Sequence, residues 1–255
     1  MDTDAGEHDP DRRIVVLTGK DALTFLQGLV TNDVLPLARA PGLVWTALLS
    51  PQGKYLADFF VANTGEALLL DLPEPLADAT LRRLAMYRLR ADVAMSAAPI
   101  HARRGLGPVP AGAMPDPRHP ALGWRGYTAV PGRAPAIDWD AIRVAHLIPA
   151  ALTELLPDDS YILEMGFERL NGVDFRKGCY VGQEVTARMK HKTELKKGLA
   201  RVAISGEAAP GTTVMSGDRE AGRLGTRSGD RALAWLRHDR AQGPMTAGAA
   251  LLSPE

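Results

Sequence analysis

Glycines at short intervals divide the C-terminal segment into brief runs of residues. Within these runs the side chains alternate in character, as they do over residues 199–204. Since successive strand residues face opposite sides, such runs predict short strands, and the glycines between them predict tight turns. The pattern predicts a small β-barrel or sandwich over residues 196–255, punctuated by Gly206, Gly211, Gly217, Gly222, Gly225 and Gly229.

The first hundred residues predict strands that are joined by hairpins, with two helices among them. A turn at 50–54 links two apolar runs, and a turn at 63–65 leads into a third. Hairpins favour an α+β fold with mainly antiparallel sheets, whereas strict alternation of strands and helices would favour a parallel sheet. The expected strands are 13–17, 44–49, 55–62, 67–70 and 91–95, and the expected helices are 20–30 and 75–89.

Composition along the chain suggests further boundaries. Residues 1–11 are acidic and predict a mobile tail, and residues 12–195 predict the main body. Within this body the Gly- and Pro-rich stretch 105–135 predicts a variable surface insertion, with a short strand at 126–130. A helix is expected over 138–147, with Asp138 as its N-cap.

Charge and cysteine content exclude several classes of protein. Lys and Arg together number 30, as do Asp and Glu, whereas a dedicated DNA-binding protein shows a strong basic excess. No apolar run approaches the roughly 20 residues that span a bilayer, and the acidic start is unlike a secretion signal. The single cysteine, Cys179, excludes an internal disulfide. These features predict a cytoplasmic protein without membrane contact and without stable DNA binding.

Polar groups of several chemical types are concentrated between residues 171 and 188. Lys177 is a cation, Cys179 a soft nucleophile, Gln183 an amide and Glu184 a carboxylate, and glycines bracket them. Glycine permits positive φ and close approach of a ligand to the backbone, and a nearby cation favours the thiolate form of cysteine. The alternative is that Cys179 is a small buried apolar residue and that the glycines only make turns.

One block resembles the signature of the YgfZ-type folate-binding proteins of iron–sulfur cluster assembly: Lys177-Gly178-Cys179-Tyr180-Val181-Gly182-Gln183-Glu184. An eight-residue block is far more specific than a lone glycine pattern. Residues 21–28 and 31–34 resemble the N-terminal block of that family, and residues 49–54 resemble its hairpin turn. The stretch 105–135 has no clear counterpart.

The YgfZ-type family is similar in turn to the T-protein of the glycine cleavage system, an aminomethyltransferase that uses tetrahydrofolate. The resemblance implies a body of two interleaved α/β subdomains around a central folate pocket, followed by a C-terminal β-barrel. It also implies tetrahydrofolate or a derivative as cofactor. The implied partners are iron–sulfur carrier or client proteins, among them radical enzymes that modify tRNA.

The T-protein carries two adjacent aspartates on the strand after its hairpin turn, and the first is its catalytic acid. At the matching positions this chain has Ala57 and Asp58. Because successive strand residues point to opposite faces, Asp58 does not replace the missing carboxylate without a bulge. The comparison argues against ordinary aminomethyl transfer, and it leaves Asp58 either as a folate contact or as an exposed strand carboxylate.

The resemblance implies further folate contacts, each with a plainer alternative. Glu164 matches a T-protein glutamate that pairs with the pterin ring; otherwise it is a surface charge at a helix end. Trp45 and Tyr180 either stack on the pterin or lie in the core. Arg188 opens a basic stretch that meets the glutamyl tail of folate, touches tRNA or simply faces solvent. Of these three alternatives for the basic stretch, contact with tRNA is not the expected one.

No spacing of residues predicts a metal site, since the six histidines are scattered and a lone cysteine cannot hold a cluster that usually needs four thiolates. The leading hypothesis is a folate-binding accessory factor for the assembly or repair of [4Fe–4S] proteins, in which Cys179 is a functional thiol. One alternative is a tetrahydrofolate-dependent one-carbon transferase. The other is a binding module without catalysis that bridges cluster carriers and clients.

Overall fold

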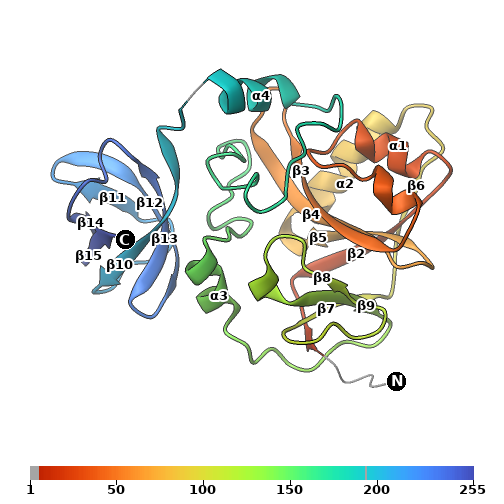
Figure 1. The fold of residues 1–255 in the computed structure, drawn as a ribbon, viewed down its shortest axis with the longest axis horizontal. Coiled ribbons are helices and arrows are strands. Elements are labelled where there is room, and N and C mark those ends of the chain that lie inside the picture. The colour runs from red at the N-terminus through yellow and green to blue at the C-terminus, as the bar shows by residue number, and fades with distance from the viewer. Residues whose placement is uncertain (1–5, 193) are drawn as a thin grey trace. The chain divides into compact units, whose positions relative to one another are not determined.

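The computed structural model describes residues 6–192 and 194–255 (Figure 1). The chain forms two compact units that interleave along the sequence. Unit 1 comprises residues up to 52 together with 56–137 and 170–183, and unit 2 comprises 53–55, 138–169 and 184–255. The described strand pairs within the sheets are antiparallel, which confirms the predicted α+β class. Among the described residues, no helix combines the length and the apolar character that crossing a membrane requires.

A five-stranded sheet with the order β3-β4-β5-β2-β6 forms the centre of unit 1. The predicted hairpin turns join its strands, and β6 begins later than expected because residues 88–93 close a turn after the preceding helix. The strands are β2 (Arg12–Thr18), β3 (Gly42–Leu49), β4 (Tyr55–Asn63), β5 (Leu68–Pro73) and β6 (Ala94–Ala97).

Helices α1 (Ala22–Gln27) and α2 (Glu74–Arg88) share one hydrophobic core with a face of this sheet. α1 is shorter than predicted, since Gly28 follows it as C-cap, and a 3-10 helix, η1 (Leu35–Ala38), comes next. Alternation along the strands decides which residues enter this core, because every second side chain points to the helices. The core includes Val15, Leu17, Leu26, Leu48, Phe59, Val61, Leu70, Leu72 and Leu84.

A second sheet, with the order β1-β7-β9-β8, packs on the other face of the first sheet. Ile14 and Leu69 of the first sheet and Ala102 of the second share this contact. Its members are β1 (Glu7–His8), β7 (His101–Gly105), β8 (Met114–Pro115) and β9 (Trp124–Thr128), and a 3-10 helix, η2 (Pro120–Leu122), precedes β9.

Two sequence predictions are wrong in this region. Residues 6–11 are not a mobile tail, because β1 pairs with β7 and the side chains of Glu7 and Asp9 are buried; residues 1–5 lie outside the described residues. The stretch 105–135 is not merely a surface insertion, because Trp124 and Arg125 are buried in the second sheet. Glycine and proline content indicated loops correctly, but it did not reveal that buried charges would tie these segments to the body.

Unit 2 contains α3 (Trp139–His146) and a closed six-stranded barrel with the order β10-β13-β12-β11-β14-β15. The side chain of Asp138 accepts a hydrogen bond from the amide of Ala141, which confirms the predicted N-cap. Helix α4 (Gln183–Lys192) was not predicted. The barrel, which was predicted, consists of β10 (Lys197–Ser205), β11 (Thr213–Ser216), β12 (Arg219–Ser228), β13 (Arg231–Arg237), β14 (Met245–Ala247) and β15 (Ala250–Pro254).

Candidate functional site

Residues 177–182 of the signature block form an irregular loop of unit 1 that exposes the thiol of Cys179. Gly178 has φ +95°, in the region that favours glycine, and a Cβ atom placed there would meet no atom within 4 Å. The next residue, Tyr180, turns back into the protein and is buried. The cysteine is therefore presented between a glycine turn and a buried aromatic anchor, and the alternative of a buried apolar cysteine is wrong.

Lys177 anchors this loop to the end of α1. Its Nζ donates hydrogen bonds to the carbonyls of Gln27, at 2.6 Å, and Val30, and it lies 5.0 Å from the centre of the Tyr180 ring. Carbonyls at a helix C-terminus lack partners within the helix, and they carry the negative end of its dipole. Burial lowers the pKa of Lys177 to about 8, although Asp33 and Asp174 act in the opposite direction.

Gln27 joins the signature loop to the N-terminal block that shares the family resemblance. Its Nε2 donates to Asp33 Oδ1 at 3.0 Å and to the Lys177 carbonyl at 3.3 Å, and its Oε1 accepts from the amide of Val34. Two blocks that lie about 150 positions apart in the sequence thus form one hydrogen-bonded structure. Both blocks carry the family resemblance in the sequence, but their contact is not predictable from it.

The segment that enters the loop is fixed by Thr31 and Asn32. Thr31 Oγ1 donates to the Gly172 carbonyl at 2.7 Å, and Asn32 Nδ2 donates to the Asn171 carbonyl at 2.6 Å. These side chains satisfy backbone groups that no strand pairs. The loop is therefore held at its entry as well as at Lys177.

The exit of the loop is fixed by the first residue of α4. Gln183 Nε2 donates to the Gly178 carbonyl at 3.0 Å, so the amide of the signature block closes the turn around Cys179. Glu184 and Arg188 form an exposed pair at 2.6 Å, one helical turn apart. Such pairs contribute little to stability, and the exposed side chain of Arg188 lies on the surface of α4.

Trp45 and Asp58 are brought together inside unit 1. The indole Nε1 donates to Asp58 Oδ2 at 2.8 Å, the Trp45 side chain is fully buried and Asp58 is 6% exposed. The alternative of an exposed strand carboxylate for Asp58 is therefore wrong. Ala57, its neighbour on β4, is buried and supplies no carboxylate. The guanidinium of Arg118 lies 5.8 Å from the Trp45 ring.

Glu164 belongs to unit 2, unlike the residues above. Its Oε2 accepts a hydrogen bond from Trp235 Nε1 at 2.9 Å, and its carbonyl accepts from the amide of Leu199. Lys197 lies 4.9 Å from the Trp235 ring. The indole orients the carboxylate at the start of the barrel, a role for Trp235 that sequence analysis missed because β13 lies 71 positions further along the chain.

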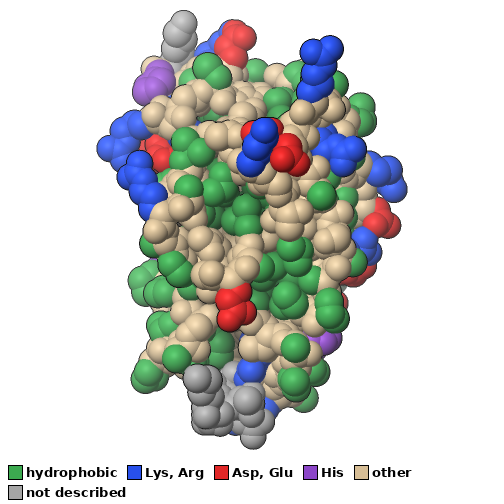
Figure 2. Space-filling model, turned by 90° about the vertical axis from the view of Figure 1, so that its right-hand side faces the viewer, with side chains coloured by type: hydrophobic (Ala, Val, Ile, Leu, Met, Phe, Trp, Pro, Cys, Tyr) green, Lys and Arg blue, Asp and Glu red, His purple; other side chains and the backbone are tan. Residues whose placement is uncertain are grey.

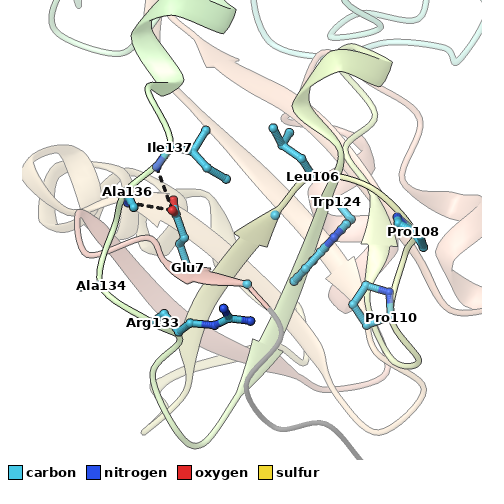
Figure 3. A pocket seen from close by; sticks show the side chains of 11 residues that line it. Glu7, Leu106, Pro108, Pro110, Trp124, Arg133, Ala134, Ala136 and Ile137 are labelled. Carbon is cyan, nitrogen blue, oxygen red and sulfur yellow. Dashed lines mark hydrogen bonds between the residues drawn. The ribbon is translucent and has the colours of Figure 1, made fainter.

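A pocket of about 390 Å³ lies beside the second sheet of unit 1 (Figure 3). Trp124, Leu106 and Ile137 contribute apolar walls. Glu7 borders it, and its Oε1 accepts hydrogen bonds from the amides of Ala136 and Ile137 at 2.7 and 2.8 Å. The carboxylate thereby fastens the segment before α3 to β1. Within the described ranges, no group of three or more His, Cys, Asp or Glu residues could hold a metal ion.

Comparison with known proteins identifies relatives for nearly the whole chain. The chain is 30% identical to the iron–sulfur cluster assembly factor IBA57, mitochondrial, of Mus musculus, over 92% of this chain and 78% of the relative. The Homo sapiens protein of the same name is also 30% identical, with the same coverage. Residues 196–255 match the family model described as CAF17, C-terminal beta-barrel domain.

A solved structure shows the same fold. The glycine cleavage system aminomethyltransferase T from Bartonella henselae superposes with a TM-score of 0.72 at 12% identity, covering 97% of this chain and 84% of that one. This confirms the predicted T-protein-like fold. The narrower YgfZ-type assignment stays a prediction.

One prediction is corrected by the relatives. The sequence predicted a cytoplasmic protein, but the mouse and human relatives are both named as mitochondrial. A single cysteine fits a reducing environment, but it does not identify the compartment that provides it.

Proposed function

The chain belongs to the family of iron–sulfur cluster assembly factors represented by IBA57, and from this membership we propose that it assists the assembly of iron–sulfur clusters through the thiol of Cys179. One observation carries the proposal. The only cysteine of the chain is exposed on a loop that is fixed by Lys177 and Gln183.

Cluster irons are usually bound by four thiolates, so the cluster is cargo that this chain holds only together with a partner. On ligation the Cys179 sulfur replaces one thiolate of the carrier on an iron, and the proton of the Cys179 thiol passes to the departing thiolate. Thiolates of the carrier or client protein hold the other iron positions. The proposed clients are [4Fe–4S] proteins, radical tRNA-modifying enzymes among them. The role of this chain is to present one sulfur in a fixed position, which limits the entropy lost when the shared cluster forms.

Replacing Cys179 by Ser tests this proposal. The side chain is exposed, so the midpoint of thermal unfolding should change little. Activity of [4Fe–4S] enzymes in cells that depend on the variant should fall. The purified variant, mixed with a cluster-loaded carrier, should lack the cluster absorption that the parent protein acquires under the same conditions. As a control, Ser253→Cys in the Cys179→Ser background supplies an exposed thiol on β15 and should not restore either signal. Full activity of Cys179→Ser would remove the thiol from the mechanism.

Binding of reduced folate is the second part of the proposal, with Glu164 as the residue that meets the pterin. The 2-amino-pyrimidine edge of a pterin donates two hydrogen bonds that suit a carboxylate. The Trp235 indole orients the Glu164 carboxylate, which supports this role. Asp58, Trp45, Tyr180 and Arg188 stay predictions as folate contacts, and the full burial of Trp45 gives it no open ring face in this conformation.

Calorimetric titration with tetrahydrofolate tests the assignment. Loss of one charge-assisted hydrogen bond in Glu164→Gln should cost about 1.5–3 kcal/mol of binding free energy. Trp235→Phe keeps the carboxylate but removes its orienting donor, so a smaller loss is expected. Equal affinity of Glu164→Gln and the parent protein would contradict the assignment. If the parent binds no tetrahydrofolate, the protein is better described as a binding module that bridges carriers and clients.

The one-carbon transferase alternative is disfavoured by a specific position. Ala57 is buried where the T-protein has its catalytic acid, and the neighbouring carboxylate of Asp58 is engaged by Trp45. We expect no methylene transfer from the aminomethyl carrier protein to tetrahydrofolate. Robust transfer in that assay would reinstate the alternative.

A further inference from the structure

The C-terminal half of α2 presents large apolar side chains and arginines to solvent. Met86 is 74% exposed and Leu89 is 89% exposed. We call the surface formed by Arg82, Arg83, Met86, Leu89 and Arg90 the α2 face. Arg82, Met86 and Leu89 follow at spacings of four and three, so they line one side of the helix. The opposite side packs in the core of unit 1 through Ala77 and Leu84.

The arginines of the α2 face lack the partners that arginines have elsewhere in this protein. The side chains of Arg82, Arg83 and Arg90 form no ion pair or hydrogen bond with any other described residue. Many other arginines of the described chain are paired, as in Arg12–Asp71, Arg125–Asp9, Arg143–Glu154 and Arg201–Glu255.

Acidic residues close to the α2 face do not neutralise it. Glu74 and Asp78, in the first half of α2, pair with Arg13. Asp21 accepts a hydrogen bond from the amide of Asp92 at 2.9 Å, which leaves the exposed Asp92 carboxylate as the acidic group that follows the arginines in sequence. With Arg88 included, four arginines oppose this one carboxylate, and the surface is positive.

Leu89 occupies a backbone conformation that suits glycine. It is the C-cap of α2, with φ +42° and ψ −104°, and a residue at positive φ after a helix is most often Gly. A non-glycine residue at positive φ is strained, and strained residues gather at functional sites. A leucine in this position gains no burial within the described chain, because almost all of its surface is exposed.

The segment after Leu89 is held rigidly, so the exposed leucine has a fixed position. Arg88 Nη1 donates to the Val93 carbonyl, and the amide of Asp21 donates to the Asp92 carbonyl. Gly19 lies so close that a Cβ atom there would be 2.0 Å from the Asp92 carbonyl oxygen. A partner that covers Leu89 therefore meets a backbone that is already ordered, so docking costs little backbone entropy.

We propose that the α2 face is a docking surface for an acidic segment of a partner protein that carries an apolar side chain to cover Met86 and Leu89. The arginines supply charge complementarity, and the apolar pair supplies the desolvated centre that protein interfaces have. A nucleic acid would use the arginines but has no need of the aliphatic pair. A lipid surface needs a longer apolar stripe than two side chains to insert. The proposal does not depend on the role of Cys179.

Figure 2 shows the side of the molecule on which β6, the strand that follows the α2 face in sequence, lies in Figure 1. Hydrophobic side chains gather in the middle of this view, and Lys and Arg side chains lie mostly in its upper half. Apolar and basic groups are therefore both available on this side of the protein.

Fluorescence anisotropy with defined probes tests the proposal on the full chain. The probes are a labelled amphipathic peptide with Glu on one helical side and Leu on the other, polyglutamate, phosphatidylglycerol vesicles and single-stranded RNA. The Glu/Leu peptide should bind most tightly, and its affinity should fall as salt rises past about 0.1 M, where the Debye length is about 10 Å. The double change Arg82→Glu with Arg83→Glu should weaken binding at least about tenfold.

Leu89→Gly separates docking from folding. Glycine relieves the strain at positive φ, so the thermal midpoint should stay or rise, while peptide affinity should fall about tenfold. The matched controls are Leu251→Ser, at an exposed leucine of the barrel, and Arg219→Glu, at an exposed arginine of β12; neither should change binding.

Three outcomes would overturn the proposal. Equal binding of polyglutamate and the Glu/Leu peptide would reduce the α2 face to a plain positive charge. Preference for vesicles or RNA would assign it to lipid or nucleic acid. A Leu89→Gly protein with lower stability and unchanged peptide affinity would make the leucine structural.

Discussion

Two groups of buried cations in unit 1 join distant parts of the chain, and they differ in what surrounds the charge. Around Asp71, the guanidinium groups of Arg12 and Arg125 and the hydroxyl of Tyr127 donate to one buried carboxylate, while Asp9 binds Arg125 at 2.8 Å. Around Lys177, the hydrogen bonds of the ammonium go to backbone carbonyls. The first group pairs charge with charge, and the second pairs charge mainly with dipoles.

The pKa values reflect this difference. Burial raises the pKa of Asp9, but Arg125, Arg104 and Arg12 outweigh burial and hold that pKa far below its usual value. Burial lowers the pKa of Lys177 to about 8, and the surrounding carboxylates do not compensate. Asp9 therefore carries its charge at neutral pH, and the ion pairs around Asp71 tie two sheets together. The Lys177 anchor is closer to losing its proton and holds only a loop, which is the loop with the thiol.

Removing the central carboxylate should have the largest effect. Asp71→Ala takes the shared carboxylate from Arg12 and Arg125, although Arg125 keeps its ion pair with Asp9. Breaking a buried pair in this way costs about 3–5 kcal/mol of unfolding free energy. Urea denaturation measures the loss. The control is Asp78→Ala, which breaks an exposed pair with Arg13 and should cost less than about 1 kcal/mol. Similar losses for both variants would show that the Asp71 group does not hold the sheets together.

Removing the loop anchor should have a smaller and more local effect. Lys177→Met leaves the carbonyls of Gln27 and Val30 without a donor, at a cost of about 1–3 kcal/mol. Hydrogen exchange should accelerate over residues 177–183 and remain unchanged in the barrel. Lys54→Met is a matched control, since Lys54 Nζ also donates to a carbonyl, that of Asp159, and lies 3.7 Å from the Tyr161 ring. If exchange accelerates throughout unit 1, the anchor is structural in the same sense as Asp71.

A change at the glycine turn should test whether loop shape alone matters. Gly178→Ala introduces a Cβ at φ +95°, which costs about 1–2 kcal/mol, and it should also lower transfer of clusters in the assay for Cys179. Gly211→Ala is the control, because Gly211 has φ +89° and open space around its Cβ position. It should show a similar loss of stability with no change in cluster transfer. Equal cluster transfer by both variants would show that the shape of the turn at Gly178 does not matter for the function.

A further expected effect is a dependence of stability on pH. The folded pKa of Lys177, about 8, lies below the usual value of 10.5, so between these values the unfolded chain binds more protons and stability rises with pH. The unfolding free energy of the parent protein relative to Lys177→Met should therefore increase from pH 8 to pH 10. A relative decrease would mean that the proton on Lys177 stabilises the fold more than burial opposes it.

The candidate site has one part that the sequence shows and another part that only the fold brings together. Residues of the signature block could be found from the sequence because their order along the chain is itself the signal, and glycines at Gly178 and Gly182 indicated the positive φ that both adopt. Gln27 binds that block, and Thr31 and Asn32 bind Gly172 and Asn171 ahead of it. All three were recognisable only as part of a second family block. Trp235 and Arg118 gave no sequence signal, since their contacts with Glu164 and Trp45 join segments 71 and 73 positions apart.

The sequence by itself determined the local elements of this protein: alternating strands, helix α2, the N-cap at Asp138 and the glycine-bounded barrel strands follow from residue type and spacing over a few positions. Only the tertiary structure decided that Glu7 and His8 form an edge strand, that β9 carries a buried arginine and that Lys177 caps α1. The composition of these three segments suggested a tail, an insertion and a solvated charge. Polar residues are stable inside a protein only when distant partners satisfy them. The identity of those partners is a property of the folded chain, and no short window of sequence contains it.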